Sequence, residues 1–586
     1  MKRLLKYLNE YRRESILAPL FKMLEALMDL LVPVIVARMI NIGIAGKDQG
    51  FLMRQAGLLV LLAAAGFGFS AAAQYFAAKA SAGAAARIRQ AVFDHIQSLS
   101  YEKLDQLGTG TLLTRMTSDI NTVQNGLNLA LRLLLRSPFI VIGSMIMAFT
   151  INARCAMIFA IYIPLLLAVV FGLMLVTIPL YRKVQGSLDR VMTLTRENLT
   201  GVRVLRAFCK ESASVREFDQ QNQLLTRLSE KVGDLSALLN PVTYILINIA
   251  AVQLIRTGAV QVSLGNLAQG DVVALYNYIA QMIVELIKLA SLIITINRAM
   301  ACADRVADIL DTDPGMAFPQ QTAGQPERRG SVVFDHVTFS YSGSPEPSLQ
   351  DISFAAAPGE TIGIIGGTGS GKSTLVSLIP RFYDATSGRV LVDGIDVRSY
   401  RQEDLIEKLG IVPQKAVLFQ GTIRENLLLG RADADEASLR QALRTAQAEE
   451  IVAGKALGLE EPIEQGGRNL SGGQRQRLAI ARALARKPEI LILDDSASAL
   501  DYATDAGLRR ALRRDERGTT VFLVSQRAAS IRHADQILVL EDGRLAGIGT
   551  HEQLMKGCRA YQEIYWSQFP EERPACMQAE GKEALA

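Results

Sequence analysis

The chain has 586 residues, of which 49% are hydrophobic and 21% are charged, and its formal net charge at pH 7 is +5. This length is too great for one compact domain, and the mixed composition predicts an apolar half joined to a soluble half. The small net charge gives no support to a nucleic acid partner, so none is expected.

The N-terminal segment MKRLLKYLNEYRRES is basic and amphipathic, and no small-residue cleavage site follows the first apolar segment, so a cleaved signal peptide is not expected. Apolar segments close to the ~20 residues that cross a bilayer come next. We identify six, at residues 16–44, 55–80, 133–152, 155–181, 236–257 and 271–298. Because they occur in regular pairs, we expect membrane-spanning helices rather than core helices of a soluble protein.

Two long charged inserts separate the second span from the third and the fourth from the fifth. Their basic residues are Arg87, Arg89, Lys103, Arg115, Arg182, Lys183, Arg190, Arg196 and Arg203. Lysine and arginine mark the cytoplasmic side, so we predict a multi-pass protein of the cytoplasmic membrane with both inserts in the cytoplasm. Each insert should turn through a short transverse helix, around 108–124 and 197–211, with Ser118, Asp119 and Asn198 as candidate caps.

The composition changes after residue 302, where the expected transmembrane domain (1–302) ends. Residues 303–330 are rich in proline, glycine and polar residues, which predicts an exposed linker. From 331 to 565, strand-like runs such as TIGIIG and EILILD alternate with helical patterns, which predicts an α/β domain with a largely buried parallel sheet. The tail, 566–586, is expected to be mobile.

The segment GGTGSGKS at 366–373 follows an apolar strand-like run and precedes a helix-like one. It is the GxxxxGK[ST] pattern in its strand–loop–helix setting, in which backbone N–H groups and a helix start surround phosphates. Lys372 can reach the β- and γ-phosphates of ATP, and the Ser373 hydroxyl suits Mg²⁺. The predicted binding residues are Gly366, Gly367, Thr368, Gly369, Ser370, Gly371, Lys372, Ser373 and Thr374.

A more specific motif, LSGGQ, opens the basic amphipathic segment in NLSGGQRQRLAIARAL (469–484). Its binding residues, which offer a hydroxyl and N–H groups to a γ-phosphate at a helix start, are Ser471, Gly472, Gly473 and Gln474. With the six spans, the chain over 1–565 resembles an exporter of the ATP-binding cassette (ABC) family, and in particular the degenerate-site subunit of a bacterial heterodimeric multidrug-type exporter.

The resemblance implies a six-helix α-helical transmembrane domain followed by a P-loop α/β ABC nucleotide-binding domain, with ATP and Mg²⁺ as cofactors. It also implies that two such domains pack head to tail, so that each ATP lies between one chain's phosphate loop and the other chain's LSGGQ. The turns of the two inserts resemble coupling helices that press on the nucleotide-binding domains.

Further residues are assigned by the resemblance one at a time. Tyr341 resembles the aromatic residue that stacks on adenine, although a tyrosine here can also be structural. Gln414 resembles the glutamine that touches Mg²⁺ and senses the transmembrane domain. Asp494 ends a strand and would hold Mg²⁺ through water, together with Ser373 and Gln414. Asp501 resembles the residue that communicates with the opposite site.

Three positions depart from the family. Gln465, just before LSGGQ, stands where a glutamate is common and bears on contacts across the domains, whereas the other two would face the γ-phosphate. The family usually has a glutamate after Asp494, whereas this chain has Asp495, one methylene or ~1.5 Å shorter, a misplacement that can cost ~10²-fold in rate. Gln526 replaces the family's histidine and cannot titrate. We therefore expect Asp495 and Gln526 to form a degenerate catalytic pair beside Lys372. LSGGQ and Asp501 would then complete a competent site on a different partner chain.

These features predict ATP-driven export of a small amphipathic molecule or lipid across the bilayer by alternating access, as half of a heterodimer. A non-transporting membrane ATP-binding regulator and a homodimeric lipid or peptide exporter remain alternatives. Import is disfavoured, because importers of the family usually keep membrane and nucleotide-binding domains on separate chains.

Polar residues inside the spans are costly and usually functional, which makes them candidates for the substrate path. They are Glu25, Asp29, Asn240, Asn248, Gln281, Glu285 and Lys288. Glu285 and Lys288 are three residues apart on one helix and can simply pair with each other. Glu25 and Asp29 would suit an amphipathic cation.

Overall fold

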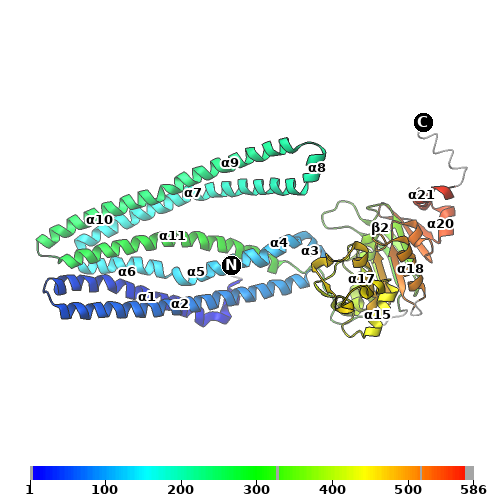
Figure 1. Ribbon diagram of the computed structural model, residues 1–586, viewed down its shortest axis with the longest axis horizontal. Coiled ribbons are helices and arrows are strands. Elements are labelled where there is room, and N and C mark those ends of the chain that lie inside the picture. Colours follow the sequence, from blue (N-terminus) through cyan, green and yellow to red (C-terminus); the bar gives the residue numbers. More distant parts are fainter. Residues whose placement is uncertain (1–3, 325–328, 515–517, 574–586) are drawn as a thin grey trace. The chain divides into compact units, whose positions relative to one another are not determined.

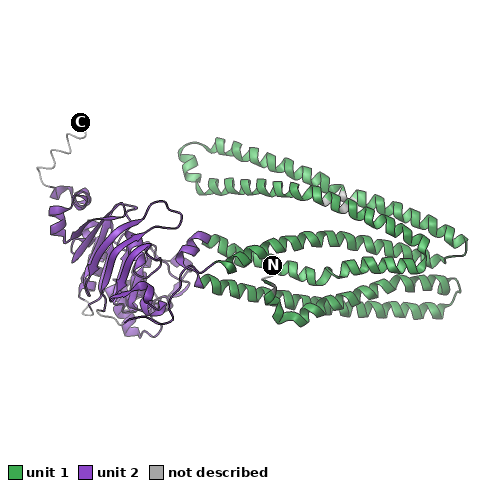
Figure 2. Cartoon of the chain, turned by 180° about the vertical axis from the view of Figure 1, so that it is seen from behind, with its two compact units in different colours: residues 1–97, 109–312 green, residues 98–108, 313–586 purple. Residues whose placement is uncertain are grey.

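The computed structural model describes residues 4–324, 329–514 and 518–573; within these, the side chains of Leu5, Val170, Met174, Leu239 and Asn240 are outside the description. The chain forms two compact units (Figure 2): unit 1 comprises residues 1–97 and 109–312, and unit 2 comprises residues 98–108 and 313–586. Residues 574–586 of the expected mobile tail lie outside the described residues.

Unit 1 consists of long helices that run side by side (Figure 1). Its helices are α1 (Arg12–Arg38), α2 (Gln49–Ser98, its last residue counted in unit 2), α4 (Thr109–Thr114), α5 (Ile120–Leu133), α6 (Arg136–Ile151), α7 (Ala153–Thr200), α8 (Val202–Ala207), α9 (Glu211–Ala237), α10 (Leu239–Ser263) and α11 (Gln269–Asp311). Among the residues that the structure describes, six helical stretches are long and apolar enough to cross a membrane, and each corresponds to one predicted segment. The prediction of six spans is confirmed.

The packing of these helices does not follow the chain order. α11 lies against α1, α5 and α6, and α7 lies against α9 and α10 (Figure 1). Buried apolar side chains from α1, α6, α7, α10 and α11 form one cluster, which includes Leu30, Phe159, Leu254 and Tyr278. The apolar faces of the spans therefore meet inside unit 1.

The first insert turns at a different place from the one predicted. Its short helix is α3 (Tyr101–Leu107), which precedes 108–124 and belongs to unit 2. Residues 109–133 form helical segments instead, and the expected cap Asp119 has helical backbone angles and no capping hydrogen bond. Its buried carboxylate pairs with Arg115 at 2.8 Å and with Arg305 of α11 at 2.6 Å. The capping prediction is wrong because Asp119 serves as a buried counter-ion.

The second insert turns where the sequence predicts. α8 lies within 197–211 and connects α7 to α9 (Figure 1). Asn198 lies inside α7, which runs to Thr200, so it caps no helix; its side-chain oxygen accepts a hydrogen bond from the Ser214 hydroxyl of α9.

The described residues of unit 2 form three sheets and short helices. Its helices are α3, α12 (Lys372–Leu378), α13 (Gln402–Lys408), α14 (Ile423–Leu428), α15 (Glu436–Thr445), α16 (Glu449–Ala453), α17 (Gly472–Ala485), α18 (Tyr502–Arg513), α19 (Ala528–Ile531), α20 (His551–Gly557) and α21 (Arg559–Gln568). Its strands are β1 (Val332–Phe339), β2 (Leu349–Ala356), β3 (Thr361–Gly366), β4 (Ser387–Val392), β5 (Ile395–Asp396), β6 (Leu409–Val412), β7 (Gly421–Thr422), β8 (Pro462–Ile463), β9 (Ile490–Asp494), β10 (Thr520–Val524), β11 (Gln536–Glu541) and β12 (Arg544–Gly549).

The largest sheet has six strands in the order β12-β11-β3-β10-β9-β6. The five strands from β11 to β6 are parallel, and β12 joins the edge antiparallel. β1 and β4 belong to a separate four-stranded sheet with β2 and β5, whose pairs are antiparallel. The predicted α/β fold with a buried parallel sheet is confirmed. The separate antiparallel sheet was not predicted from the sequence.

Both ends of unit 2 differ from the expected boundaries. α11 of unit 1 continues past residue 302 to Asp311, because Ala303, Val306 and Ile309 are buried along one of its faces. α21 continues past residue 565 to Gln568, and a short 3-10 helix follows at Pro570–Glu572. Residues 566–573 are therefore part of the packed unit.

Candidate nucleotide-binding site

The parallel strands of unit 2 bring distant sequence segments to one edge of the sheet. β3 ends at the phosphate loop, β9 ends at Asp494, β10 is followed by Gln526, and β6 is followed by Gln414. In the β-ladder, Val524 lies opposite both Ile364 and Asp494, so the carboxyl ends of these strands are level. Ligands of open α/β sheets bind outside the carboxyl ends of the strands.

A cleft of about 720 Å³ opens at this edge, and most of the predicted own-site residues line it. They are Tyr341, Thr368, Gly369, Gly371, Lys372, Ser373, Thr374, Gln414, Asp494, Asp495 and Gln526. The other loop residues, Gly366, Gly367 and Ser370, lie in the same loop, where the side chain of Lys372 reaches them. The structure thus gathers both the expected binding residues and the two unusual ones in one place.

The phosphate loop has the geometry that its glycines permit. Gly369 and Gly371 have φ of +84° and +94°, a region that favours glycine. A Cβ atom on Gly371 would also lie 2.7 Å from the Ser348 carbonyl oxygen. The Lys372 ammonium donates to the carbonyl oxygens of Gly366 at 3.0 Å and Gly367 at 2.6 Å. The loop is therefore wrapped around the lysine, at the N-terminus of α12.

Oxygen atoms suited to a hard cation stand beside this lysine. The Ser373 hydroxyl donates to the Asp494 carboxylate at 3.0 Å, and Gln414 lines the same cleft. Oxygen ligands of this kind are the ones that Mg²⁺ prefers, so the residues present fit the predicted metal. Burial raises the pKa of Asp494, and the neighbouring charge of Asp495 adds to this, while Ser373 opposes it. Burial likewise lowers the pKa of Lys372.

The turn after Asp494 fixes the backbone of Asp495. Asp495 has φ of +45°; its N–H donates to the Val524 carbonyl at 3.1 Å, and its own carbonyl accepts from the N–H of Ser498 at 3.2 Å and from its hydroxyl at 2.7 Å. The carboxylate extends toward Gln414, whose side-chain amide is 3.5 Å away. Burial raises the pKa of this carboxyl group. With the backbone held on both sides, the reach of residue 495 depends on the length of its side chain.

The loop that carries Gln526 is held by two residues that the sequence reading missed. Gln568 of α21 donates to the Gln526 carbonyl oxygen at 2.8 Å and accepts from the N–H of Ala528 at 2.8 Å. The Arg527 guanidinium donates to the carbonyl oxygens of Leu500 at 3.1 Å and Ser498 at 3.2 Å. Arg527 therefore joins the Gln526 loop to the Asp495 turn. Neither residue belongs to a recognisable sequence motif, and Gln568 lies in the segment that the sequence predicts to be a mobile tail.

Tyr341 stands at the rim of the cleft. Its ring packs edge-on against Phe339 and Tyr383, with centroids 4.8 and 5.3 Å apart, and its hydroxyl lies 3.1 Å from that of Thr374. The side chain is 38% exposed, so part of the ring is available to a base. Both readings of this tyrosine, structural and adenine-binding, fit these contacts.

The LSGGQ residues and Asp501 do not line the cleft; each stands at the start of a helix. Ser471 caps α17, where its hydroxyl accepts from the N–H of Gln474 at 3.3 Å and the Gln474 side chain accepts from the N–H of Ser471 at 3.0 Å. Gly472 and Gly473 form the first turn of that helix. Asp501 caps α18 through the N–H of Thr504 at 2.7 Å. Ser471, Gly472 and Asp501 are exposed, as residues that contact another chain must be.

α3 also belongs to this unit, although it lies far from the nucleotide-binding motifs in sequence. Its Tyr101 ring packs on Phe382 with centroids 4.3 Å apart, and its Asp105 accepts a hydrogen bond from the Tyr383 hydroxyl at 2.7 Å. Burial, followed by the bond to Asp105, raises the pKa of Tyr383. Tyr383 also packs against Tyr341, so α3 contacts the same aromatic group that stands at the cleft.

Comparisons with known proteins agree with this arrangement. The ABC transporter transmembrane region family matches residues 15–286, and the ABC transporter family matches residues 349–498. An uncharacterized ABC transporter ATP-binding protein of Mycobacterium tuberculosis is 36% identical over 96% of this chain and 97% of its own length. The solved structure of a bacterial Atm1-family ABC exporter with ATP bound has a TM-score of 0.80 and 25% identity, covering 96% of this chain and 100% of that one.

Two further relatives have names that state a cargo. A fatty acid ABC transporter ATP-binding/permease protein of Mycobacterium tuberculosis is 32% identical over 82% of this chain and 75% of its own length. A probable multidrug resistance ABC transporter ATP-binding/permease protein of Bacillus subtilis is 33% identical over 82% of each chain. The chain belongs to the ABC transporter family, as an exporter-type half-transporter in which six membrane-spanning helices are fused to a cytoplasmic nucleotide-binding domain.

Proposed function

We propose that this chain is the degenerate-site half of a heterodimeric exporter. It would bind Mg²⁺ and ATP in its own cleft and hydrolyse that ATP slowly. The same chain would supply LSGGQ to a second half-transporter whose site turns over rapidly. ATP-driven closure of the two nucleotide-binding domains would then switch the spans from inward-facing to outward-facing, with α3 and α8 as the coupling helices.

The observation that carries this proposal is the joint position of Asp495 and Gln526. Both line the cleft with Lys372, Ser373 and Gln414, where a general base must come within ~2.6–3.2 Å of the attacking water. The fixed turn leaves Asp495 one methylene short of a glutamate. Gln526, which can hydrogen-bond but cannot accept a proton at physiological pH, gives no substitute.

A small amphipathic molecule or a lipid is the cargo class that we propose. Its support is the pair of relatives named for fatty acid transport and for probable multidrug resistance, since fatty acids and many drugs are amphipathic. The bilayer itself would supply such molecules to the spans.

The test compares the chain alone with the chain in complex with the half-transporter that co-purifies from its native membrane, both in lipid nanodiscs. The complex should hydrolyse ATP rapidly and the chain alone should be at least about 10-fold slower, with Lys372→Ala of this chain as the control for its own site. Equal turnover by the chain alone would refute the heterodimer. Failure of the complex to move Hoechst 33342 or a fluorescent fatty acid into inside-out vesicles, with ATPase intact, would refute export and favour a regulator.

A further inference from the structure

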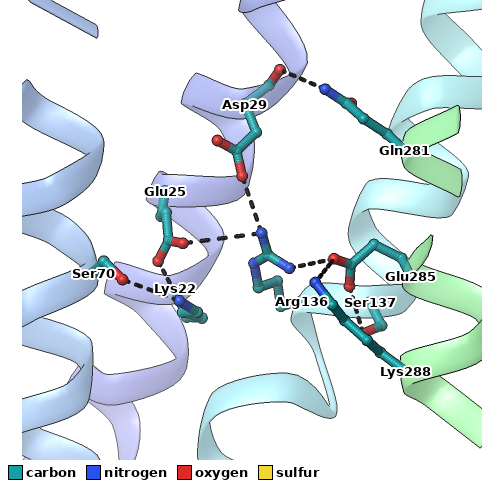
Figure 3. Close-up of polar contacts among 9 residues, drawn as sticks. All are labelled: Lys22, Glu25, Asp29, Ser70, Arg136, Ser137, Gln281, Glu285 and Lys288. Atoms are coloured by element: carbon teal, nitrogen blue, oxygen red, sulfur yellow. Dashed lines mark hydrogen bonds and ion pairs between the residues drawn. The ribbon is translucent and has the colours of Figure 1, made fainter. Parts of the chain in front are cut away.

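Six ionisable side chains meet inside the membrane-spanning part of unit 1, at the junction of α1, α6 and α11 (Figure 3). The Arg136 guanidinium of α6 lies between the other two helices, 2.5 Å from Glu285, 3.0 Å from Asp29 and 3.9 Å from Glu25. Lys22 and Lys288 pair with Glu25 and Glu285 at 2.5 and 3.0 Å. Charges at this depth are costly and are kept where they have a role.

Two of the three carboxylates are largely buried within this network. Glu285 is 5% exposed and accepts from Arg136, Lys288 and the Ser137 hydroxyl (Figure 3). Glu25 is 14% exposed and accepts from Lys22, which also reaches the Ser70 hydroxyl of α2 at 3.2 Å. Buried charges with several close partners of this kind hold helices together and have little capacity for another ligand.

The Asp29 carboxylate is more exposed than those of Glu25 and Glu285, and one of its oxygens is open. Its side chain is 43% exposed, and within the described part of the chain it has a single ion pair, from one of its oxygens to Arg136. Because a carboxylate facing lipid is strongly disfavoured, its open side must face a water-filled path or a partner. Buried apolar residues stand close by: Leu30 follows it in α1, and Tyr278 of α11 donates to the Leu30 carbonyl oxygen at 2.6 Å.

The charge of the exposed group gives the sign of the ligand. Lys288 is 47% exposed on a flexible stem and is three residues from Glu285 on the same helix. With Lys288 counted, the network has three cations against three carboxylates and is balanced overall, so the group that it leaves open is the second oxygen of the Asp29 carboxylate, which is negative. A negative group beside apolar side chains is the environment that recognises an organic cation with an apolar body.

We propose that the open face of the Asp29 carboxylate is the point at which the transmembrane domain recognises the positive charge of an amphipathic organic cation. This inference rests on the proposed export function and narrows its cargo. In the absence of cargo, Arg136 balances the carboxylate, so that no uncompensated charge remains in the span.

Tetraphenylphosphonium and tetraphenylborate test the inference, because they have nearly the same shape and opposite charge. Equilibrium binding of each is measured on the solubilised full complex without ATP, and ATP-driven uptake of each is measured in inside-out proteoliposomes. Asp29→Asn should weaken tetraphenylphosphonium binding about 10-fold or more, and Asp29→Glu should restore most of it. Tetraphenylborate binding should not weaken in Asp29→Asn.

Glu14→Gln is the matched control, because Glu14 is another carboxylate of α1, paired with Lys79 at 3.0 Å and outside the network. It should bind tetraphenylphosphonium as the unmodified chain does. Equal tetraphenylphosphonium binding by Asp29→Asn and the unmodified chain would overturn the inference. An equal loss of binding for both probes would also overturn it, because it would indicate that Asp29 has a structural role. Binding that depends on Asp29 without ATP-driven uptake would support the inference and count against export. ATP-driven uptake of tetraphenylphosphonium that does not depend on Asp29 would support export and overturn the inference.

Discussion

Lengthening the side chain at position 495 should speed hydrolysis at this chain's own site. In Asp495→Glu the backbone N–H and carbonyl keep their hydrogen bonds to Val524 and Ser498, so the added methylene extends the carboxylate into the cleft by ~1.5 Å. A correction of that size is worth up to ~10²-fold in rate, which corresponds to ~2.7 kcal/mol in the activation free energy.

The backbone conformation of residue 495 could oppose this gain. At φ of +45°, glutamate is less well accommodated than aspartate, at a cost of roughly 1–2 kcal/mol. The three hydrogen bonds that hold the turn contribute about 1 kcal/mol each, so the turn should keep its shape. The strain is present in both the ground state and the transition state, and therefore lowers the free energy of unfolding rather than the rate.

The assay is single-turnover hydrolysis of γ-labelled ATP in the complex, with the partner's own site inactivated. Asp495→Glu should be between 10-fold and 100-fold faster than the unmodified chain, and Asp495→Asn should be no faster. Adding Gln526→His to Asp495→Glu should raise the rate again. If both the single and the double variants bind ATP normally and hydrolyse it within twofold of the unmodified rate, the shortened carboxylate does not limit this site and the reasoning is refuted.

Four other changes have definite expected outcomes. Ser471→Arg, at the exposed start of α17, should abolish rapid ATPase of the complex but preserve ATP binding in this chain's cleft; retained turnover would contradict the proposed contribution of LSGGQ to the partner. Gln568→Leu leaves the buried N–H of Ala528 unpaired, which costs about 1–3 kcal/mol, so the unfolding midpoint of the nucleotide-binding domain should fall. Tyr383→Phe removes the bond to Asp105 and should reduce cargo-stimulated ATPase without changing ATP affinity. Burial holds the pKa of His551 below its ordinary value of about 6.5, so its neutral form favours the fold; stability should fall as pH is lowered from 7.5 to 5.5, and less so in His551→Gln.

The nucleotide cleft was largely predictable because each of its parts is a short segment at the end of a strand, although the segments are far apart in sequence. The phosphate loop and Asp494 each follow an apolar strand, and the carboxyl ends of parallel strands must meet at one edge. That rule brings Gln414 and Gln526 to the same place without any knowledge of helix packing. The positions of these residues could therefore be anticipated, whereas their roles in catalysis remain predictions that the proposed assays address.

Features that depend on tertiary contacts could not be anticipated in this way. Asp119 looks like a helix cap in sequence, but Arg305, almost two hundred residues later, makes it a buried counter-ion. The spacing of Glu285 and Lys288 predicts their ion pair, which the structure contains at 3.0 Å. Arg136 gave no signal, because it stands at the edge of an apolar segment, where an arginine is ordinarily a marker of the interface. Its three carboxylate partners come from two other helices.

The positions of Asp495 and Gln526 support functional asymmetry between the two ATP sites of the proposed heterodimer more strongly than the number of changed residues does. Asp494, Asp495 and Gln526, which we propose act at this chain's own ATP, follow the ends of the parallel strands β9 and β10, and the two departures from the family that would face the γ-phosphate belong to this group. The residues proposed to act on the partner's ATP stand at helix starts, and there Ser471 and Asp501 retain the family's pattern and their capping hydrogen bonds. General loss of function would affect both sets alike. Changes at the two γ-phosphate-facing side chains, with LSGGQ and Asp501 retained, are expected if one site is relieved of rapid hydrolysis and the other depends on this chain to complete it.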